Sequence, residues 1–332
     1  LYVVDVESGE QTCVSPDGLQ VWEHCWSPDG KKLAVVASDL PYEQAWYTCR
    51  LVEISLDGGD ARTIHSAKRQ VARPAWSPDG RQLAFLSSNW SDRGITPGAV
   101  FVAPAGGGKA REVSSGHRAS SVSLEWSDDS RRLITAAHEL GSVGLAEIDV
   151  ATAERTSLWR GEASFWEGSS IFSTDSRGNV AVVRESSTEP PDVWLARRKP
   201  SGVEWERLTR LHAEAADVDI GDTDTIHWKG ADGWEMQGLV IRPVGPGGGP
   251  YPMVTMVHGG PTGAHKYQYH AAGRGFQLLA ARGIAVFLPN PRGSTGWGLE
   301  FAESNIGDMG GKDWEDIQAG IDHCVAEGIA DP

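Results

Sequence analysis

The sequence lacks any long apolar run, any paired cysteine motif and any surplus of basic residues. No stretch of 18 apolar residues occurs in the 332-residue chain, so no membrane-spanning helix is expected. The four cysteines, at positions 13, 25, 49 and 324, show no CxxC spacing, which favours reduced thiols in a cytoplasmic protein. The 45 acidic and 30 basic residues give a net charge of −15, which opposes binding to nucleic acid or to a membrane surface.

Motifs for metals and cofactors are missing as well. Three histidines lie close together at positions 258, 265 and 270, but no HExxH or Cys/His ligand spacing accompanies them, so we interpret them as loop or surface residues. The glycines of residues 293–298 have the wrong order for GxGxxG, and no P-loop lysine follows them. We therefore expect neither a metal nor a cofactor.

What the sequence does contain is a repeat. The motif WSPDG at residues 26–30 recurs 50 residues later at 76–80, and a degraded copy, WSDDS, stands at 126–130. A fourth copy, FSTDS, occupies residues 172–176. Serine and aspartate accept backbone hydrogen bonds, proline presets φ and glycine supplies a positive φ, so the motif predicts a tight hairpin turn. We expect the preceding tryptophan to pack between neighbouring repeats.

Each repeat predicts about four short strands, because a short apolar run follows every motif and a polar or glycine turn joins a second strand pair. Four antiparallel strands per ~40 to 50 residues are typical of a β-propeller blade. We count four full blades and the tail of a fifth at residues 1–21, and assign residues 1–216 to this domain. The repeats resemble those of the TolB and prolyl oligopeptidase families.

From residue 217 the pattern changes to alternating strands and helices, which indicates an α/β domain over 217–332. A strand pair is expected over 217–241, a buried parallel strand at 253–257, a helix over 272–282 capped by Gly283, and a second buried strand at 284–288. A last helix is expected over 311–328, with an apolar stripe formed by Trp314, Ile317, Ile321 and Cys324. The loops after the two parallel strands should leave the same edge of the sheet, where such folds place their ligands.

Three motifs in this second domain resemble the prolyl oligopeptidase family of serine peptidases. They are HGGP at 258–261, NPRGSTGWG at 290–298 and GDMGGKDWEDI at 307–317, and their order and spacing are those of the family. The acylaminoacyl peptidase and dipeptidyl aminopeptidase type is the most similar. The resemblance implies a partial β-propeller of four to five blades followed by the first part of an α/β-hydrolase domain. It also implies a serine peptidase that cleaves short peptides by acyl transfer.

The resemblance assigns candidate site residues. A carbonyl attacked by a nucleophile becomes an oxyanion, which needs backbone N–H donors, and successive glycines let bare backbone approach it. The family pattern makes the Gly260 N–H a donor, with His258 bracing the loop and Gly259 and Arg292 in support. Taken alone, the HGGP segment is equally compatible with a glycine-rich turn, and Arg292 with a plain surface arginine.

The catalytic triad is absent from this chain. No GxSxG nucleophile motif occurs, and in the family it would begin roughly ten residues after Pro332, with the acid and the histidine later still. Because the sequence starts at Leu1 without a methionine, we expect the true amino terminus to lie upstream. We therefore expect a fragment, inactive by itself, whose partners are a short peptide or acyl-peptide substrate and the remainder of its own polypeptide. The sequence is compatible with a homo-oligomer. It is also compatible with two alternative functions, an esterase on the same scaffold and a non-catalytic binding propeller.

Overall fold

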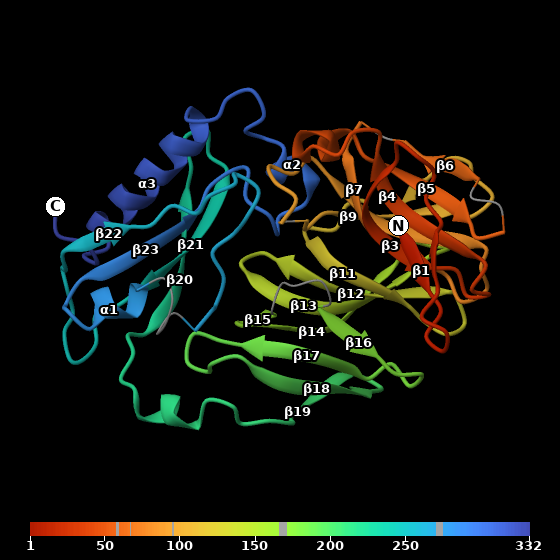
Figure 1. Cartoon of the computed structure of the whole chain (residues 1–332). Helices are drawn as coiled ribbons and strands as arrows, with labels where there is room; N and C mark the ends of the chain where they lie inside the picture. Colours follow the sequence, from red (N-terminus) through yellow and green to blue (C-terminus); the bar gives the residue numbers. More distant parts are fainter. Residues whose placement is uncertain (58–59, 67, 95, 166–170, 270–274) are drawn as a thin grey trace. The chain divides into compact units, whose positions relative to one another are not determined.

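The computed structural model describes residues 1–57, 60–66, 68–94, 96–165, 171–269 and 275–332 (Figure 1). The chain divides into two compact units. The first comprises Leu1–His117, Ser121–Thr135 and Ala146–Thr156. The second comprises Arg118–Ser120, Ala136–Leu145 and Ser157–Pro332, and it contains all of the α/β elements.

Four antiparallel sheets follow one another along the chain, and each is built of strands consecutive in sequence. The first contains β3 (Gln20–Trp26), β4 (Lys32–Ser38), β5 (Arg50–Ser55) and β6 (Ala61–His65). The second contains β7 (Gln70–Trp76), β8 (Gln82–Ser88), β9 (Ala99–Pro104) and β10 (Arg111–Glu112). The third contains β11 (Ser120–Trp126), β12 (Arg132–Glu139), β13 (Ser142–Asp149) and β14 (Arg155–Gly161). The fourth contains β15 (Ser164–Phe165), β16 (Phe172–Thr174), β17 (Val180–Glu185), β18 (Asp192–Lys199) and β19 (Gly202–Arg207).

A hairpin of β1 (Tyr2–Val4) and β2 (Gln11–Cys13) precedes these sheets. Two short 3₁₀ helices, η1 (Glu43–Thr48) and η2 (Ala213–Asp217), lie between strands. Four consecutive sheets of propeller-blade type and a preceding strand pair confirm the predicted number of blades.

The repeated motif forms the turn that its chemistry predicts. The Ser27 hydroxyl donates to the Asp29 carboxylate at 2.7 Å and accepts the Lys32 N–H at 2.9 Å, and Gly30 has φ +69°. Residues 77–82 repeat the same bonds. In the degraded copy Ser130 adopts φ +61° in place of glycine, so the left-handed conformation belongs to the turn itself.

The motif tryptophans differ in their packing. Trp126 is 8% exposed, and its indole N–H donates to the Ala75 carbonyl on β7 at 3.0 Å, which joins the second and third sheets as predicted. Trp76 packs partly buried against the same core. Trp26, by contrast, is 47% exposed, so the expectation of packing between repeats is wrong at the first copy.

The α/β part is a mixed sheet with helices on both faces. Its strands are β20 (Thr223–Lys229), β21 (Glu235–Ile241), β22 (Met253–Thr255) and β23 (Ala285–Asn290), in the order β20-β21-β23-β22. Strand β23 is fully buried: Val286 and Leu288 pack in the core that includes Phe276 of α1 (Phe276–Ala280), and Phe287 packs in the core that includes Cys324 of α3 (Lys312–Ala326). This alternation confirms an α/β arrangement.

Strand β22 is parallel to β23, as predicted, but it is half-buried rather than buried. The reason is its place at the edge of the described sheet, where only one neighbour covers it. Beside its start, Tyr251 forms a parallel bridge with Ala330, in which the Tyr251 N–H donates to the Ile329 carbonyl and the Asp331 N–H donates to the Tyr251 carbonyl. The chain after α3 therefore begins to pair along the outer edge of β22.

The two longer helices expected from the sequence are both observed in part or in full. The first three residues of the predicted helix, 272–274, lie outside the described residues, and α1 is observed from Phe276, with Gly283 at φ +79° after its end. In α3, Ile317 and Cys324 are buried as predicted, but Trp314 is 49% exposed. At 3.6 residues per turn Trp314 lies about 200° around the helix from the buried Asp316, on the opposite face.

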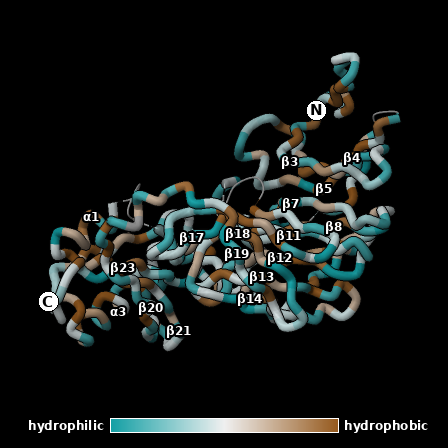
Figure 2. The backbone as a smooth tube through the Cα atoms, turned by 90° about the horizontal axis from the view of Figure 1, so that it is seen from below, coloured by the Kyte–Doolittle hydropathy of each residue, from teal (hydrophilic) through white to brown (hydrophobic). Residues whose placement is uncertain are grey.

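All four cysteines are free, in agreement with the expected thiols. Among the described residues no helix is long and apolar enough to cross a membrane, and Figure 2 shows hydrophobic residues in short stretches along the backbone.

Candidate active site

Two loops leave the same edge of the α/β sheet, because β22 and β23 are parallel and both loops follow their carboxyl ends. The first contains residues 256–263 and the HGGP motif. The second contains residues 291–298, which lead into the short helix α2 (Leu299–Ala302). The predicted meeting of the two loops is confirmed by a hydrogen bond from the Thr295 N–H to the Gly263 carbonyl, at 2.8 Å.

Gly260 has a backbone that only glycine adopts without strain. Its φ is +136°, and a Cβ at this position would lie 2.4 Å from the Thr262 nitrogen. Both Gly259 and Gly260 are exposed, and within the described part of the chain the Gly260 N–H has no acceptor. An exposed glycine with an unpaired amide, at the carboxyl end of a parallel strand pair, is suited to bind an external oxygen atom.

His258 connects the two loops. Its Nε2 lies 2.9 Å from the Ser294 hydroxyl, and its Nδ1 lies 3.1 Å from the Gly259 carbonyl oxygen. The ring also meets the His265 ring edge to face, with centroids 5.3 Å apart. These contacts suit the predicted bracing role of His258.

A network of buried hydrogen bonds holds the first loop next to the HGGP motif. The Asn290 side-chain oxygen accepts the His265 N–H at 2.7 Å, and its amide nitrogen donates to Gln237 at 2.8 Å. The His265 ring donates through Nε2 to the Met256 carbonyl at 2.7 Å. His265 lies in a loop, as expected, but it is 3% exposed and therefore not a surface residue, whereas His270 lies outside the described residues.

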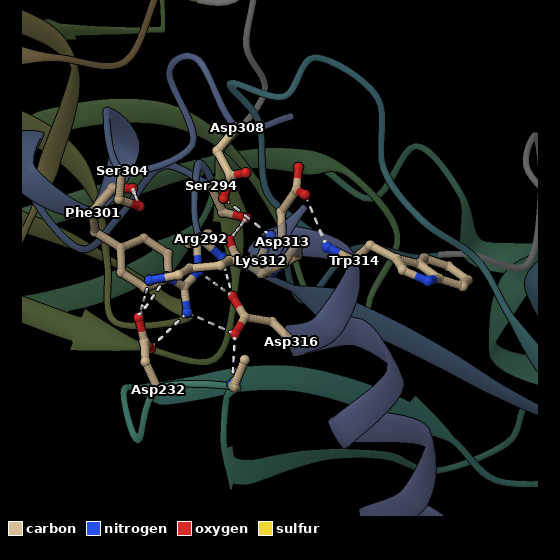
Figure 3. Close-up of polar contacts among 12 residues, drawn as sticks. Asp232, Arg292, Ser294, Phe301, Ser304, Asp308, Lys312, Asp313, Trp314 and Asp316 are labelled. Carbon is tan, nitrogen blue, oxygen red and sulfur yellow. Dashed lines mark hydrogen bonds and ion pairs between the residues drawn. The ribbon is translucent and has the colours of Figure 1, made fainter. Parts of the chain in front are cut away.

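Arg292 lies at the centre of an ion cluster (Figure 3). Its guanidinium forms paired hydrogen bonds with Asp316, at 2.7 and 2.9 Å, and with Asp232, at 2.9 and 2.7 Å. It also faces the Trp234 ring at 5.3 Å, and Lys312 donates to Asp232 at 3.2 Å. Arg292 is 3% exposed, so it is a buried anchor of the second loop and not a plain surface arginine.

Electrostatics fix the charges of this cluster. The hydrogen bonds to Asp316 and Asp232 raise the pKa of Arg292 above its already high value. Hydrogen bonds from Arg292 and then from Lys312 hold the pKa of Asp232 well below its usual range. Because Arg292 and Asp232 stay ionised at neutral pH, and Arg292 also bonds to Asp316, the cluster ties the turn at Asp232, the second loop and helix α3 together.

Sequence reasoning missed both carboxylate partners of Arg292 and the Ser294 contact. By its position in the sequence Asp316 suits the favourable end of the helix dipole, yet it is 0% exposed and shares the buried stripe with Gly320 and Cys324. A carboxylate at a position of the apolar stripe becomes buried, and a buried carboxylate needs a cation to face it. This position of Asp316 was therefore a signal in the sequence for a buried cationic partner. Nothing in the sequence near Ser294 pointed to His258.

The second loop is buried over residues 291–297 and has further contacts inside its compact unit. The Thr295 hydroxyl lies 3.2 Å from Nδ1 of His138 on β12, and the Gly296 N–H donates to the Ser120 hydroxyl at 2.9 Å. The loop thus joins the first loop to two residues of the third antiparallel sheet. Within the described ranges, no group of three or more His, Cys, Asp or Glu side chains is placed to hold a metal.

Comparisons with known proteins show what this chain is similar to. The model of the prolyl oligopeptidase family matches residues 270–332. The uncharacterized peptidase YuxL of Bacillus subtilis is 30% identical over 202 residues, which are 60% of this chain and 29% of that protein. The acylamino-acid-releasing enzyme of Mus musculus is 27% identical over 215 residues, 61% of this chain and 28% of the enzyme.

Among solved structures, the acylaminoacyl peptidase of Pyrococcus horikoshii matches 99% of this chain and 49% of its own, with a TM-score of 0.72 and 19% identity. This likeness shows the shared fold of propeller sheets followed by the start of a hydrolase domain. The chain thus spans about half of that structure and less than a third of those two curated relatives. On these matches, residues 270–332 are similar to the prolyl oligopeptidase family, and the chain shares the fold of its solved relative.

Proposed function

We propose that the whole protein is a serine peptidase of the acylaminoacyl or dipeptidyl type, and that this chain supplies one oxyanion donor, the Gly260 N–H. The observation that carries the proposal is the exposed amide of Gly260, which no described residue accepts and which follows a parallel strand. In the reaction a serine oxygen attacks the peptide carbonyl, its proton passes to a histidine, and the carbonyl oxygen becomes an anion. That anion receives the Gly260 hydrogen bond until the C–N bond breaks, the carbonyl re-forms and the histidine gives its proton to the leaving amine. Water then attacks the acyl-serine in the same way and releases the acid and the free serine.

The serine, the histidine and the acid of this mechanism belong to sequence outside residues 1–332. The Tyr251–Ala330 bridge supports this arrangement. A strand continued from that bridge would run parallel to β22, so its carboxyl end would lie at the same sheet edge as Gly260. A nucleophile at that end is the position at which α/β-hydrolases carry their serine.

Covalent labelling by a fluorophosphonate probe tests the proposal. The full-length protein should be labelled on one serine and should hydrolyse a short peptide p-nitroanilide, while a protein of residues 1–332 should remain unlabelled. Labelling of the 1–332 protein would overturn the assignment of the nucleophile. An unlabelled, inactive full-length protein would overturn the peptidase and leave the non-catalytic binding propeller.

The printed names of the two curated relatives, a peptidase and an acylamino-acid-releasing enzyme, favour peptide over ester substrates. Turnover of matched peptide and ester substrates by the full-length protein separates the two, and faster ester turnover with no peptide cleavage would select the esterase. The four free cysteines favour a cytoplasmic location for the whole protein.

A further inference from the structure

Ser294 is a buried hydroxyl that the proposed reaction does not use. It is 0% exposed, and its hydroxyl donates to the Pro291 carbonyl at 2.6 Å. A serine hydroxyl has one hydrogen and two acceptor lone pairs. Since its hydrogen is committed to Pro291, Ser294 faces His258 as an acceptor, and the proton of this 2.9 Å bond belongs to Nε2 of His258.

The other side of the imidazole faces the peptide that joins Gly259 to Gly260. Nδ1 of His258 lies 3.1 Å from the Gly259 carbonyl oxygen, which can only accept. The Gly259 carbonyl and the Gly260 N–H belong to one planar peptide unit, so a bond that holds the carbonyl also fixes the direction of the N–H.

We propose that Ser294 is a positioning residue that sets the direction of the Gly260 N–H through His258. Pro291 fixes the Ser294 hydroxyl, Ser294 holds the imidazole, and the imidazole holds the Gly259 carbonyl. The buried Arg292 cluster anchors the loop that carries Ser294, two residues away (Figure 3). This inference rests on the proposed role of Gly260 as an oxyanion donor.

The chain offers a matched control. The Ser304 hydroxyl donates to the Phe301 carbonyl at 2.7 Å, which repeats the bond of Ser294 to the carbonyl three residues before it. Both serines appear in Figure 3, but only Ser294 contacts His258. Removal of either hydroxyl therefore deletes the same kind of local bond. Only removal of the Ser294 hydroxyl also affects His258 and, through it, the Gly259–Gly260 peptide.

The experiment measures kcat and KM of the full-length protein on a short peptide p-nitroanilide. Ser294→Ala should lower kcat by about 10- to 100-fold with KM changed less than about threefold, because a misdirected donor weakens only the transition state. Ser304→Ala should leave both constants within about twofold. Melting temperatures of the two variants are compared so that a loss of folding is recognised.

A double-mutant cycle distinguishes positioning from general destabilisation. If Ser294 acts through His258, Ser294→Ala should lower kcat no further in a protein that already carries His258→Ala. Equal losses of kcat in both backgrounds, or an unchanged kcat in Ser294→Ala, would overturn the inference while the active wild type keeps the proposed function. If Ser294→Ala does not fold, Ser294→Cys takes its place, because a thiol is only a weak donor and acceptor.

Discussion

At the scale of single residues, the candidate site depends on one glycine whose backbone no other residue adopts freely. Gly260 was singled out by the resemblance of HGGP to the family pattern, because the segment taken alone is equally compatible with a glycine-rich turn. The sequence was not sufficient for the partners of Arg292, because Asp232 and Asp316 are 60 and 24 positions away from it. Contacts of that kind arise from the packing of a turn and a helix against a loop, which periodicity does not encode.

Gly260→Ala should remove most of the activity of the full-length protein. The added Cβ would meet the Thr262 backbone nitrogen at 2.4 Å and φ +136° is strained for alanine, so the loop must change its conformation. We expect kcat/KM to fall by about 100-fold or more. Gly248→Ala is the control, since a Cβ there has nothing within 4 Å, and its kcat/KM should stay near the wild-type value. Full activity of Gly260→Ala would exclude Gly260 as the donor.

Arg292→Met should destabilise the protein by about 3–5 kcal/mol, because Asp316 would stay buried without its cation. The measurement is urea unfolding followed by tryptophan fluorescence. Arg197→Met provides the contrast: Arg197 and Glu206 form an ion pair whose side chains are 48% and 47% exposed, and its loss should cost less than about 1 kcal/mol. Equal effects of the two substitutions would contradict a special role of the buried cluster.

At the scale of elements, the turns and strands of the repeat could be predicted well because each carries its own chemistry. The α/β strands were also placed correctly within a few residues. Two burial predictions were wrong because burial depends on tertiary contacts. The strand β22 lies at the edge of the sheet, and Trp314 lies on the outer face of α3. An apolar run indicates a strand, but it does not say how many neighbours will cover it.

Trp126→Phe should weaken the contact between the second and third sheets. Phenylalanine keeps one aromatic ring but loses the pyrrole ring and the N–H that donates to the Ala75 carbonyl, so we expect a loss of about 1–3 kcal/mol in the free energy of unfolding. Trp314→Phe is the matched change at a half-exposed site and should cost less than about 0.5 kcal/mol. A larger loss for Trp314→Phe would contradict this assignment.

The β18–β19 pair gives a pH-dependent contribution to stability. Burial opposes ionisation of Asp192, but hydrogen bonds from Thr209 and Arg207 outweigh it and lower its pKa to about 2. Since this lies below the unfolded value of about 3.9, the contribution is present above about pH 4 and is lost as the pH falls towards 2. Asp192→Asn should therefore destabilise the protein at pH 7 and about half as much at pH 3, as measured by urea unfolding. An equal difference at both pH values would show that the ionised Asp192 carboxylate does not provide this stability.

At the scale of the whole molecule, we expect a protein of residues 1–332 to associate at rising concentration. The outer edge of β22 pairs only through the Tyr251–Ala330 bridge among the described strands, and Val257 beyond it is 53% exposed. Unpaired strand edges recruit other strands. Light scattering should show particles that grow with concentration, and lysine substitution of Val257 should reduce them. A monodisperse, cooperatively melting protein would contradict the expectation.

The Tyr251–Ala330 bridge also has a consequence for the order of folding. The strands β20 and β21 are joined by a short turn, whereas the two residues of the bridge are 79 positions apart. Closing so long a loop costs more chain entropy than closing a hairpin, and non-local parallel pairing is slow. We therefore expect the hairpin to form early and the edge strand β22 late. The loop that carries Gly260 would then be among the last parts of the α/β sheet to become fixed.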